Sequence, residues 1–189
     1  MQHLILASWI RSKRGITMTT FTNKLQNHVK DFHEAFSHPV GDKPAPISLE
    51  RAINRSVWTA EECIEFIAAS CNSKEEFAKA YETFASGLVK AYEKSLNGEF
   101  ATTDEEKVIA QADALADQLY FSFGSAVEIG IDIEPVFDIV QSANMSKLFT
   151  DENGNKYAKC REDGKILKSP EFFKPEPFIK EEVLKQMKK

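Results

Sequence analysis

The 189-residue sequence has little of several features that mark the more specialised classes of protein. Eight glycines and seven prolines are too few for a fibrous or disordered chain. Three cysteines form no Cys-x-x-Cys pair and no even set, which argues against a zinc site or a disulfide framework and favours a reducing compartment. No apolar run approaches the roughly 20 residues that span a bilayer. We therefore expect a cytoplasmic protein that has no membrane partner.

The composition that is present fits a single globular domain with its own core, because 42% of the residues are hydrophobic and 28% are charged. The net charge of −5 is unevenly spread. Acidic residues dominate 18–146, whereas 1–17 and 147–189 carry an excess of basic ones. An acidic body suggests cation binding and a basic tail suggests contacts with anions. We do not expect nucleic acid as a partner.

The first 17 residues are expected to lie outside the fold. Their apolar part precedes their basic part, which is the reverse of the order in a secretory signal. We interpret them as an N-terminal extension. The functional helical domain is then expected at 18–150, with a basic tail at 151–189 packed on it.

Helical periodicity and N-cap signals predict an all-α fold, an antiparallel bundle of four to five helices. Ser48, Ser73 and Thr103 each precede a long apolar-periodic stretch, and the last two begin capping boxes. A shorter helix should begin near Asp132, and the tail should form a small hairpin or stay irregular, with Asp163-Gly164 as a turn signal. The long helices are expected at about 21–37, 49–69, 74–96 and 104–128. Their apolar stripes should form the core of the bundle, and they include Leu49, Ile53, Val57, Leu88, Val89, Tyr92, Leu115 and Leu119.

Three acids on the second of these helices form the first candidate site. Glu61, Glu62 and Glu65 fall within an arc of roughly 100° at 3.6 residues per turn. Like charges so close together destabilise a helix, so a divalent cation would be a natural compensation. An ordinary solvated acidic face is the alternative, and this stretch alone does not exclude it.

A second pair of acids, Asp113 and Asp117, shares one face of the last long helix. Tyr120 and Phe121 flank the direction of Asp117 and make bulk water a less suitable surrounding for it. Two acidic helix faces can oppose each other in a bundle if a cation lies between them. Because no histidine or cysteine accompanies these acids, the set favours Mg²⁺, with Mn²⁺ as a possible substitute. Such an ion usually shares its coordination with substrate phosphates.

Taken together, these motifs resemble the all-α nucleoside triphosphate pyrophosphohydrolases, the MazG-like group that includes phosphoribosyl-ATP pyrophosphohydrolase. Likeness to its Cof-like subgroup covers most of 21–177 and rests on five segments. Those segments are DFHEAF (31–36), DALADQLY (113–120), GIDIEPVFDIV (130–140), NMSKL (144–148) and REDGKILKSPEFFKPEP (161–177). Two positions depart from the pattern: Ala114 stands where the superfamily has an acid, and Gln141 where the subgroup often has a histidine.

The resemblance implies hydrolysis of a nucleoside triphosphate, or of a related nucleotide, to the monophosphate and pyrophosphate. It assigns Mg²⁺ binding to acids on both helices and a catalytic role to Glu61, which would orient the attacking water or bind a second metal. The implied metal ligands are Glu62, Glu65, Asp113 and Asp117. Asn144, Lys147, Lys165 and Lys168 are our candidates for contacts with the substrate's phosphates, since lysine presents a point charge to phosphate oxygens.

Two alternatives stay open at this point. Lys165 and Lys168 could be the solvated side of a hairpin, and Asn144 could end a short helix. The whole chain could also be a non-catalytic helical interaction module whose acidic faces are solvated or bind structural cations. We also expect a homodimer or higher homo-oligomer, because the family usually pairs its subunits and because the aromatic faces exceed what four helices can hide.

Overall fold

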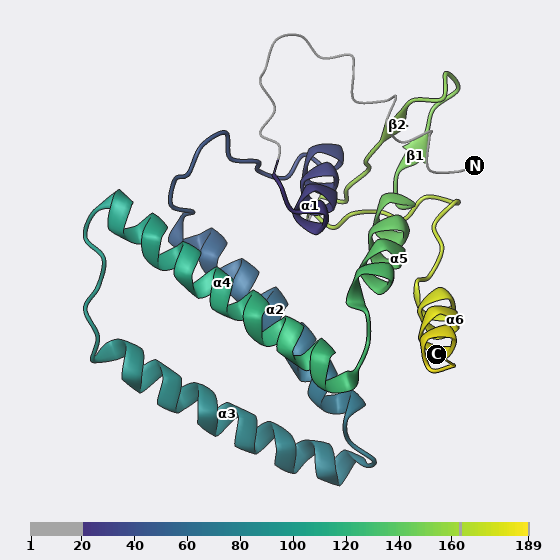
Figure 1. Ribbon diagram of the computed structural model, residues 1–189. Helices are drawn as coiled ribbons and strands as arrows, with labels where there is room; N and C mark the ends of the chain where they lie inside the picture. Colours follow the sequence, from purple (N-terminus) through teal and green to yellow (C-terminus); the bar gives the residue numbers. More distant parts are fainter. Residues whose placement is uncertain (1–20, 163, 189) are drawn as a thin grey trace. The chain divides into compact units, whose positions relative to one another are not determined.

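The computed structural model describes residues 21–162 and 164–188, and it confirms the all-α class with a small hairpin in the C-terminal part (Figure 1). The described chain forms six helices and one antiparallel two-stranded sheet. Residues 1–17, interpreted above as an extension, lie outside the described residues. The elements are α1 Lys24–Ala35, α2 Leu49–Ala69, α3 Lys74–Leu96, α4 Asp104–Ile129, α5 Ile133–Met145, β1 Phe149–Thr150, β2 Lys156–Tyr157 and α6 Glu176–Gln186.

The chain divides into two compact units, and the division falls inside α4. One unit is Ala45–Ala116, which holds α2, α3 and the first part of α4. The other combines the described residues up to Pro44 with those from Asp117 onward. This division differs from the sequence-based domain boundaries at 17/18 and 150/151, which stay a prediction. None of the described helices is both long enough and apolar enough to cross a membrane.

Side-chain caps set where the helices of the first unit begin. The Ser48 hydroxyl accepts a hydrogen bond from the Arg51 N–H at 3.2 Å. Before α3, the Ser73 hydroxyl accepts from the Glu76 N–H at 3.1 Å. At the start of α4 the box closes in both directions, because Thr103 Oγ1 accepts from the Glu106 N–H while Glu106 Oε2 accepts from the Thr103 N–H at 3.0 Å. These bonds satisfy N–H groups that have no partner inside a helix.

The expected core of the bundle is corrected by the structure, because the apolar stripes of the long helices are not buried within one chain. Leu49 is 77% exposed and Tyr92 is 64% exposed. α2 packs against α3, but neither helix contains a buried residue. A helix pair covers one narrow stripe of each partner, and these stripes are wider than that. The exposed members include Leu49, Ile53, Val57, Leu88, Val89, Tyr92, Leu115 and Leu119.

The other unit is assembled around α5, which packs against α1 and α6. Lys24 of α1 forms ion pairs with Glu134 and Asp138 of α5 at 2.6 and 2.8 Å. Gln141 Nε2 donates to the His28 carbonyl at 2.7 Å. The subgroup's histidine position is thus used here to hold α5 against α1. The buried apolar side chains of this unit are Phe36, Ala126, Ala143 and Leu148.

The C-terminal tail is ordered by two reversals of the chain and one helix. β1 pairs with β2, and further on Cys160 and Ile166 form an antiparallel bridge around Gly164, whose φ is +80°. Glycine adopts this left-handed conformation without a steric penalty. The predicted turn is therefore confirmed at Gly164, while Asp163 lies outside the described residues.

The final helix is anchored to the rest of its unit. α6 packs against α5, and the Gln186 side chain accepts from the Asp132 N–H at 2.8 Å and donates to the Asp132 carbonyl at 3.0 Å. The periodicity of one helix could not predict this contact, because Asp132 lies more than fifty positions before Gln186.

The capping box of α4 predicts a pH dependence of stability. Hydrogen bonds from the backbone N–H groups and hydroxyls of Thr103 and Thr102 lower the pKa of Glu106 from 4.5 to about 2. The ionised carboxylate therefore stabilises the fold above about pH 4.5, and this contribution is lost as the pH falls toward 2. In urea unfolding between pH 5 and pH 2, Glu106→Gln should flatten the loss of stability seen in the parent. Glu105→Gln, which removes an exposed charge next to it, should keep the parent's slope, and equal slopes for all three proteins would contradict the assignment.

Candidate active site

The acids of α2 lie at the surface and have no basic partner among the described residues. Glu61, Glu62 and Glu65 are all exposed, and none of them forms an ion pair or a side-chain hydrogen bond with another described residue. On the same helix, the Arg51 guanidinium lies over the ring of Trp58, 5.9 Å from its centroid. Arg51 thus contacts an aromatic ring, and the three carboxylates have no basic partner among the described residues.

The acids of α4 have the same character. Asp113 and Asp117 are exposed, four positions apart on one continuous helix, and without an ion pair among the described residues. The expected aromatic neighbours are exposed as well: Tyr120 and Phe121 meet edge to face with their centroids 6.3 Å apart. Each helix therefore presents a carboxylate face edged by aromatic rings.

These two faces supply the donors for a hard divalent cation but do not meet in a described cluster. Within 21–162 and 164–188, no group of three or more His, Cys, Asp or Glu side chains is arranged to hold a metal ion. Glu62 and Glu65 belong to one unit and Asp117 to the other. The metal cage, with Glu61 beside it, thus stays a prediction. Its donor chemistry, carboxylate oxygens alone, fits Mg²⁺ or Mn²⁺.

Three of the four predicted phosphate contacts do come together. Asn144 and Lys147, at the end of α5, and Lys168, from the tail, line one pocket of about 390 Å³. Lys147 Nζ donates to Asn144 Oδ1 at 2.7 Å, so Asn144 orients this lysine from inside α5 and does not cap the helix. Lys165 is not among the residues that line the pocket.

The positive charges of this pocket favour the binding of an anion. Burial lowers the pKa of Lys147, and the neighbouring charge of Lys168 lowers this pKa further. Lys168 Nζ lies 4.3 Å from the centroid of the Phe172 ring. A bound anion would offset both the desolvation of Lys147 and the repulsion between the two ammonium groups.

Sequence reasoning missed the part of the pocket that the last loop contributes. Phe172, Lys174 and Glu176 also line it. Phe172 and Lys174 stand in a Phe- and Pro-rich stretch that has no helical or strand period, and Glu176 is the first residue of α6, so spacing could not place them near the end of α5.

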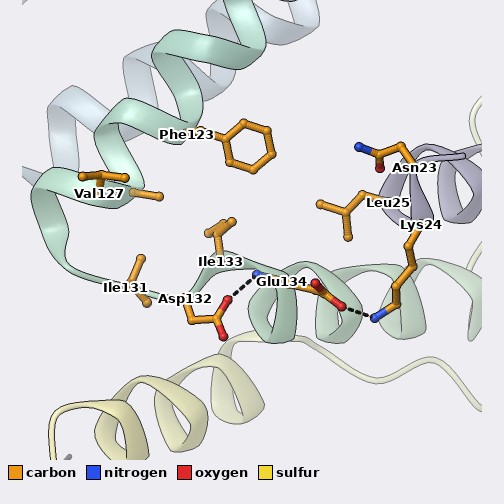
Figure 2. Close-up of a pocket in the computed structure, with 10 residues that line it drawn as sticks. Asn23, Lys24, Leu25, Phe123, Val127, Ile131, Asp132, Ile133 and Glu134 are labelled. Carbon is orange, nitrogen blue, oxygen red and sulfur yellow. Dashed lines mark hydrogen bonds and ion pairs between the residues drawn. The ribbon is translucent and has the colours of Figure 1, made fainter.

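A second, larger pocket of about 460 Å³ lies between the beginnings of α1 and α5 and the end of α4 (Figure 2). Leu25, Phe123 and Val127 contribute apolar surface to it. The one lysine that lines it, Lys24, is already paired with Glu134. This pocket therefore offers no free positive charge to a phosphate. The pocket at the other end of α5, which Lys147, Lys168 and Lys174 line and which we call the lysine pocket, differs in this respect.

Comparison with known proteins defines the class to which this arrangement belongs. A crystal structure from Exiguobacterium sp. 255-15, provisionally assigned as an NTP pyrophosphohydrolase, is similar to the chain with a TM-score of 0.82 and 42% identity. The likeness covers 88% of this chain and 97% of that one. No curated protein matches the sequence. The chain is thus an enzyme of the all-α nucleotide pyrophosphohydrolase class.

The family model for phosphoribosyl-ATP pyrophosphohydrolase matches residues 29–144. The chain belongs to this family, as the motifs of α2, α4 and α5 predicted. The matched range holds all five candidate acids and Asn144, and it ends before Lys147, Lys165 and Lys168. The match to the family model therefore does not bear on these three lysines.

The lysine pocket predicts a measurable coupling between two titrating groups. Replacing Lys168 with Met should raise the pKa of Lys147 part of the way toward 10.5, because the like charge is removed while burial, the larger cause, remains. The pKa can be followed by NMR on ¹³C-methylated lysines. Lys180→Met, on the exposed side of α6, is the matched control and should leave the titration unchanged. A Lys147 pKa that is unaffected by Lys168→Met would contradict the pocket's geometry.

Proposed function

We propose that the protein catalyses the Mg²⁺-dependent hydrolysis of a nucleoside triphosphate, or of a related nucleotide, to the monophosphate and pyrophosphate. The family supports a pyrophosphohydrolase. The charge of the two helix faces is the observation that supports Mg²⁺ dependence and a polyphosphate substrate. Five carboxylates stand on α2 and α4 with no cationic partner among the described residues. Acids held this way suit a divalent cation that a polyphosphate substrate brings or shares.

Each acid has a role that its chemistry allows. Glu62, Glu65 and Asp117 would hold Mg²⁺, and Asp113, one turn before Asp117, would be a near ligand. When bound, the ion would polarise the phosphoryl oxygens and offset the charge that develops on them. Mn²⁺, which accepts the same oxygen donors, is expected to substitute.

Glu61 is then free to act on water. The water oxygen attacks a phosphorus of the anhydride, the bond from that phosphorus to the bridging oxygen breaks, and the products are a monophosphate and pyrophosphate. The Glu61 carboxylate orients the water and accepts its proton, because it shares the turn of Glu62 and Glu65 without lying between them. Asn144, Lys147 and Lys168 hold the phosphates, and Lys165 is the weakest of our candidates because it does not line the pocket.

The functional form is a homo-oligomer, and a homodimer is the simplest. Within α3 alone, Leu88, Val89 and Tyr92 are each more than half exposed and share one side of the helix. Monomeric proteins rarely expose contiguous apolar patches of this kind. A second copy would cover them with an equally apolar surface. The three free cysteines, two of them exposed, suit the reducing environment of the cytoplasm.

Substitution of the metal-binding acids tests the reaction. The full-length protein should release pyrophosphate and a monophosphate from members of a nucleotide panel when Mg²⁺ is present. Glu62→Gln and Asp117→Asn should each lower kcat/KM by roughly 100-fold or more, as the loss of a few kcal/mol of charge stabilisation requires. Glu50→Gln, an exposed acid three turns earlier on α2, is the control and should retain parental activity. Parental rates in both site variants would refute the assignment.

The oligomeric state is tested by light scattering coupled to size-exclusion chromatography. The parent should elute with a mass at least twice 21.3 kDa. Tyr92→Glu should shift the equilibrium toward monomer, because a charge would be buried at the contact without a partner. Lys90→Glu, on a more polar side of α3, should leave the mass unchanged. A parent protein that is monomeric at micromolar concentration would rule out the pairing.

A further inference from the structure

The lysine pocket is built by two parts of the chain that are distant in sequence. α5 contributes Val140, Ala143 and Asn144, Lys147 follows the end of α5, and the segment from Lys168 to Glu176 forms the rest. Both parts belong to one unit. The volume of about 390 Å³ lies in the lower part of the range for small-molecule sites.

Buried hydrogen bonds hold the tail segment against α5. Ser169, which is 6% exposed, donates from its hydroxyl to the Ser146 carbonyl at 2.8 Å. The same hydroxyl accepts from the Glu171 N–H at 3.1 Å. Ser146 Oγ accepts from the Phe173 N–H at 3.3 Å. The walls of the pocket are therefore fixed before any ligand binds, which lowers the entropic cost of binding.

Positive charge in this pocket exceeds the negative charge available to it. Lys147, Lys168 and Lys174 all line the pocket, and none of them forms an ion pair with a described residue. Two lysines elsewhere in the same unit, Lys24 and Lys156, each reach a carboxylate within 2.8 Å.

Two nearby negative groups do not balance the three ammonium groups. Glu176 lines the pocket but forms no ion pair with any of the lysines among the described residues. The carboxyl end of α5 offers the equivalent of about half a charge. At least one further negative charge is needed for balance, and a polyphosphate supplies several.

The ring of Phe172 positions one of these lysines. Its face lies 4.3 Å from Lys168 Nζ, which favours one arrangement of an otherwise flexible side chain. Lys147 is oriented by its hydrogen bond to Asn144. Two lysines are thus oriented, and Lys174, which is exposed and has no described partner, can move to meet the ligand.

We propose that this pocket binds the terminal phosphates of the substrate, with Lys174 as an additional phosphate-binding residue beside Lys147 and Lys168. The inference rests on the proposed function and narrows it. A substrate with a free terminal diphosphate group, such as a nucleoside triphosphate, engages all three lysines.

Calorimetry with inorganic pyrophosphate tests the pocket separately from the reaction. The full-length protein is titrated in EDTA, so that no divalent ion contributes to binding. Lys174→Met should weaken pyrophosphate binding roughly tenfold or more, as expected for the loss of a charge-assisted hydrogen bond. Lys174→Arg should restore most of the affinity, and Lys180→Met should match the parent. Parental affinity in both Lys174→Met and Lys168→Met would overturn the proposal.

Steady-state kinetics distinguish this proposal from the one on which it rests. With a nucleoside triphosphate and Mg²⁺, Lys174→Met should raise KM by a similar factor, because Lys174 contacts the terminal phosphates of the bound substrate before the reaction begins. A parent that hydrolyses nucleotides, with KM unchanged in Lys174→Met, would overturn the terminal-phosphate site and leave the proposed function standing. Lysine-dependent pyrophosphate binding by a protein that hydrolyses no nucleotide would overturn the proposed function instead.

Discussion

Repulsion between like charges is the constraint on which this account of the protein depends. Three carboxylates share about one turn of α2 and two more share a face of α4, and no basic side chain among the described residues neutralises them. Every such pair costs a helix a few tenths of a kcal/mol in water and more where water is excluded. Positive charges lie close together in the same way at the end of α5, where three lysines line one pocket. Exposed acids of this kind suit a cation, and unpaired lysines suit an anion.

The local features of the fold could be predicted because their causes lie within a few residues. Ser48, Ser73 and Thr103 begin the helices that they were expected to begin, since each cap bonds an N–H group three positions away. Asp132 likewise begins α5, by accepting from the Glu134 N–H. Gly164 takes the left-handed conformation that its turn requires.

The features that could not be predicted depend on partners far along the chain. The stripe that includes Leu49 and Tyr92 was assigned to the core, yet burial needs a facing surface that periodicity cannot specify. Lys174 lines the lysine pocket because Ser169 and Ser146 hold the tail against the end of α5, over a separation of 23 residues. Gln141, which stands where the subgroup often has a histidine, bonds the backbone of α1, and no local pattern predicts that contact. The acids of α2 and α4 could be recognised as a set from their spacing and motif, but their meeting around one ion stays a prediction.

The exposed apolar stripes and the acidic faces are both consistent with the proposed homo-oligomer. α2 and α4 carry both, so an assembly that covers the apolar stripes would also lower the dielectric around the carboxylates and strengthen their attraction for a cation. A non-catalytic interaction module would explain the stripes, but neither the family to which the chain belongs nor the lysine pocket.

Anomalous diffraction from crystals grown with Mn²⁺ and a non-hydrolysable nucleotide tests the central claim most directly. The account predicts an anomalous peak at roughly 2.1–2.3 Å from carboxylate oxygens of Glu62, Glu65 and Asp117, with the nucleotide's phosphates completing the coordination. Crystals that contain the nucleotide but show no peak at these acids, with Glu62 and Asp117 turned away from each other into bulk solvent, would contradict it.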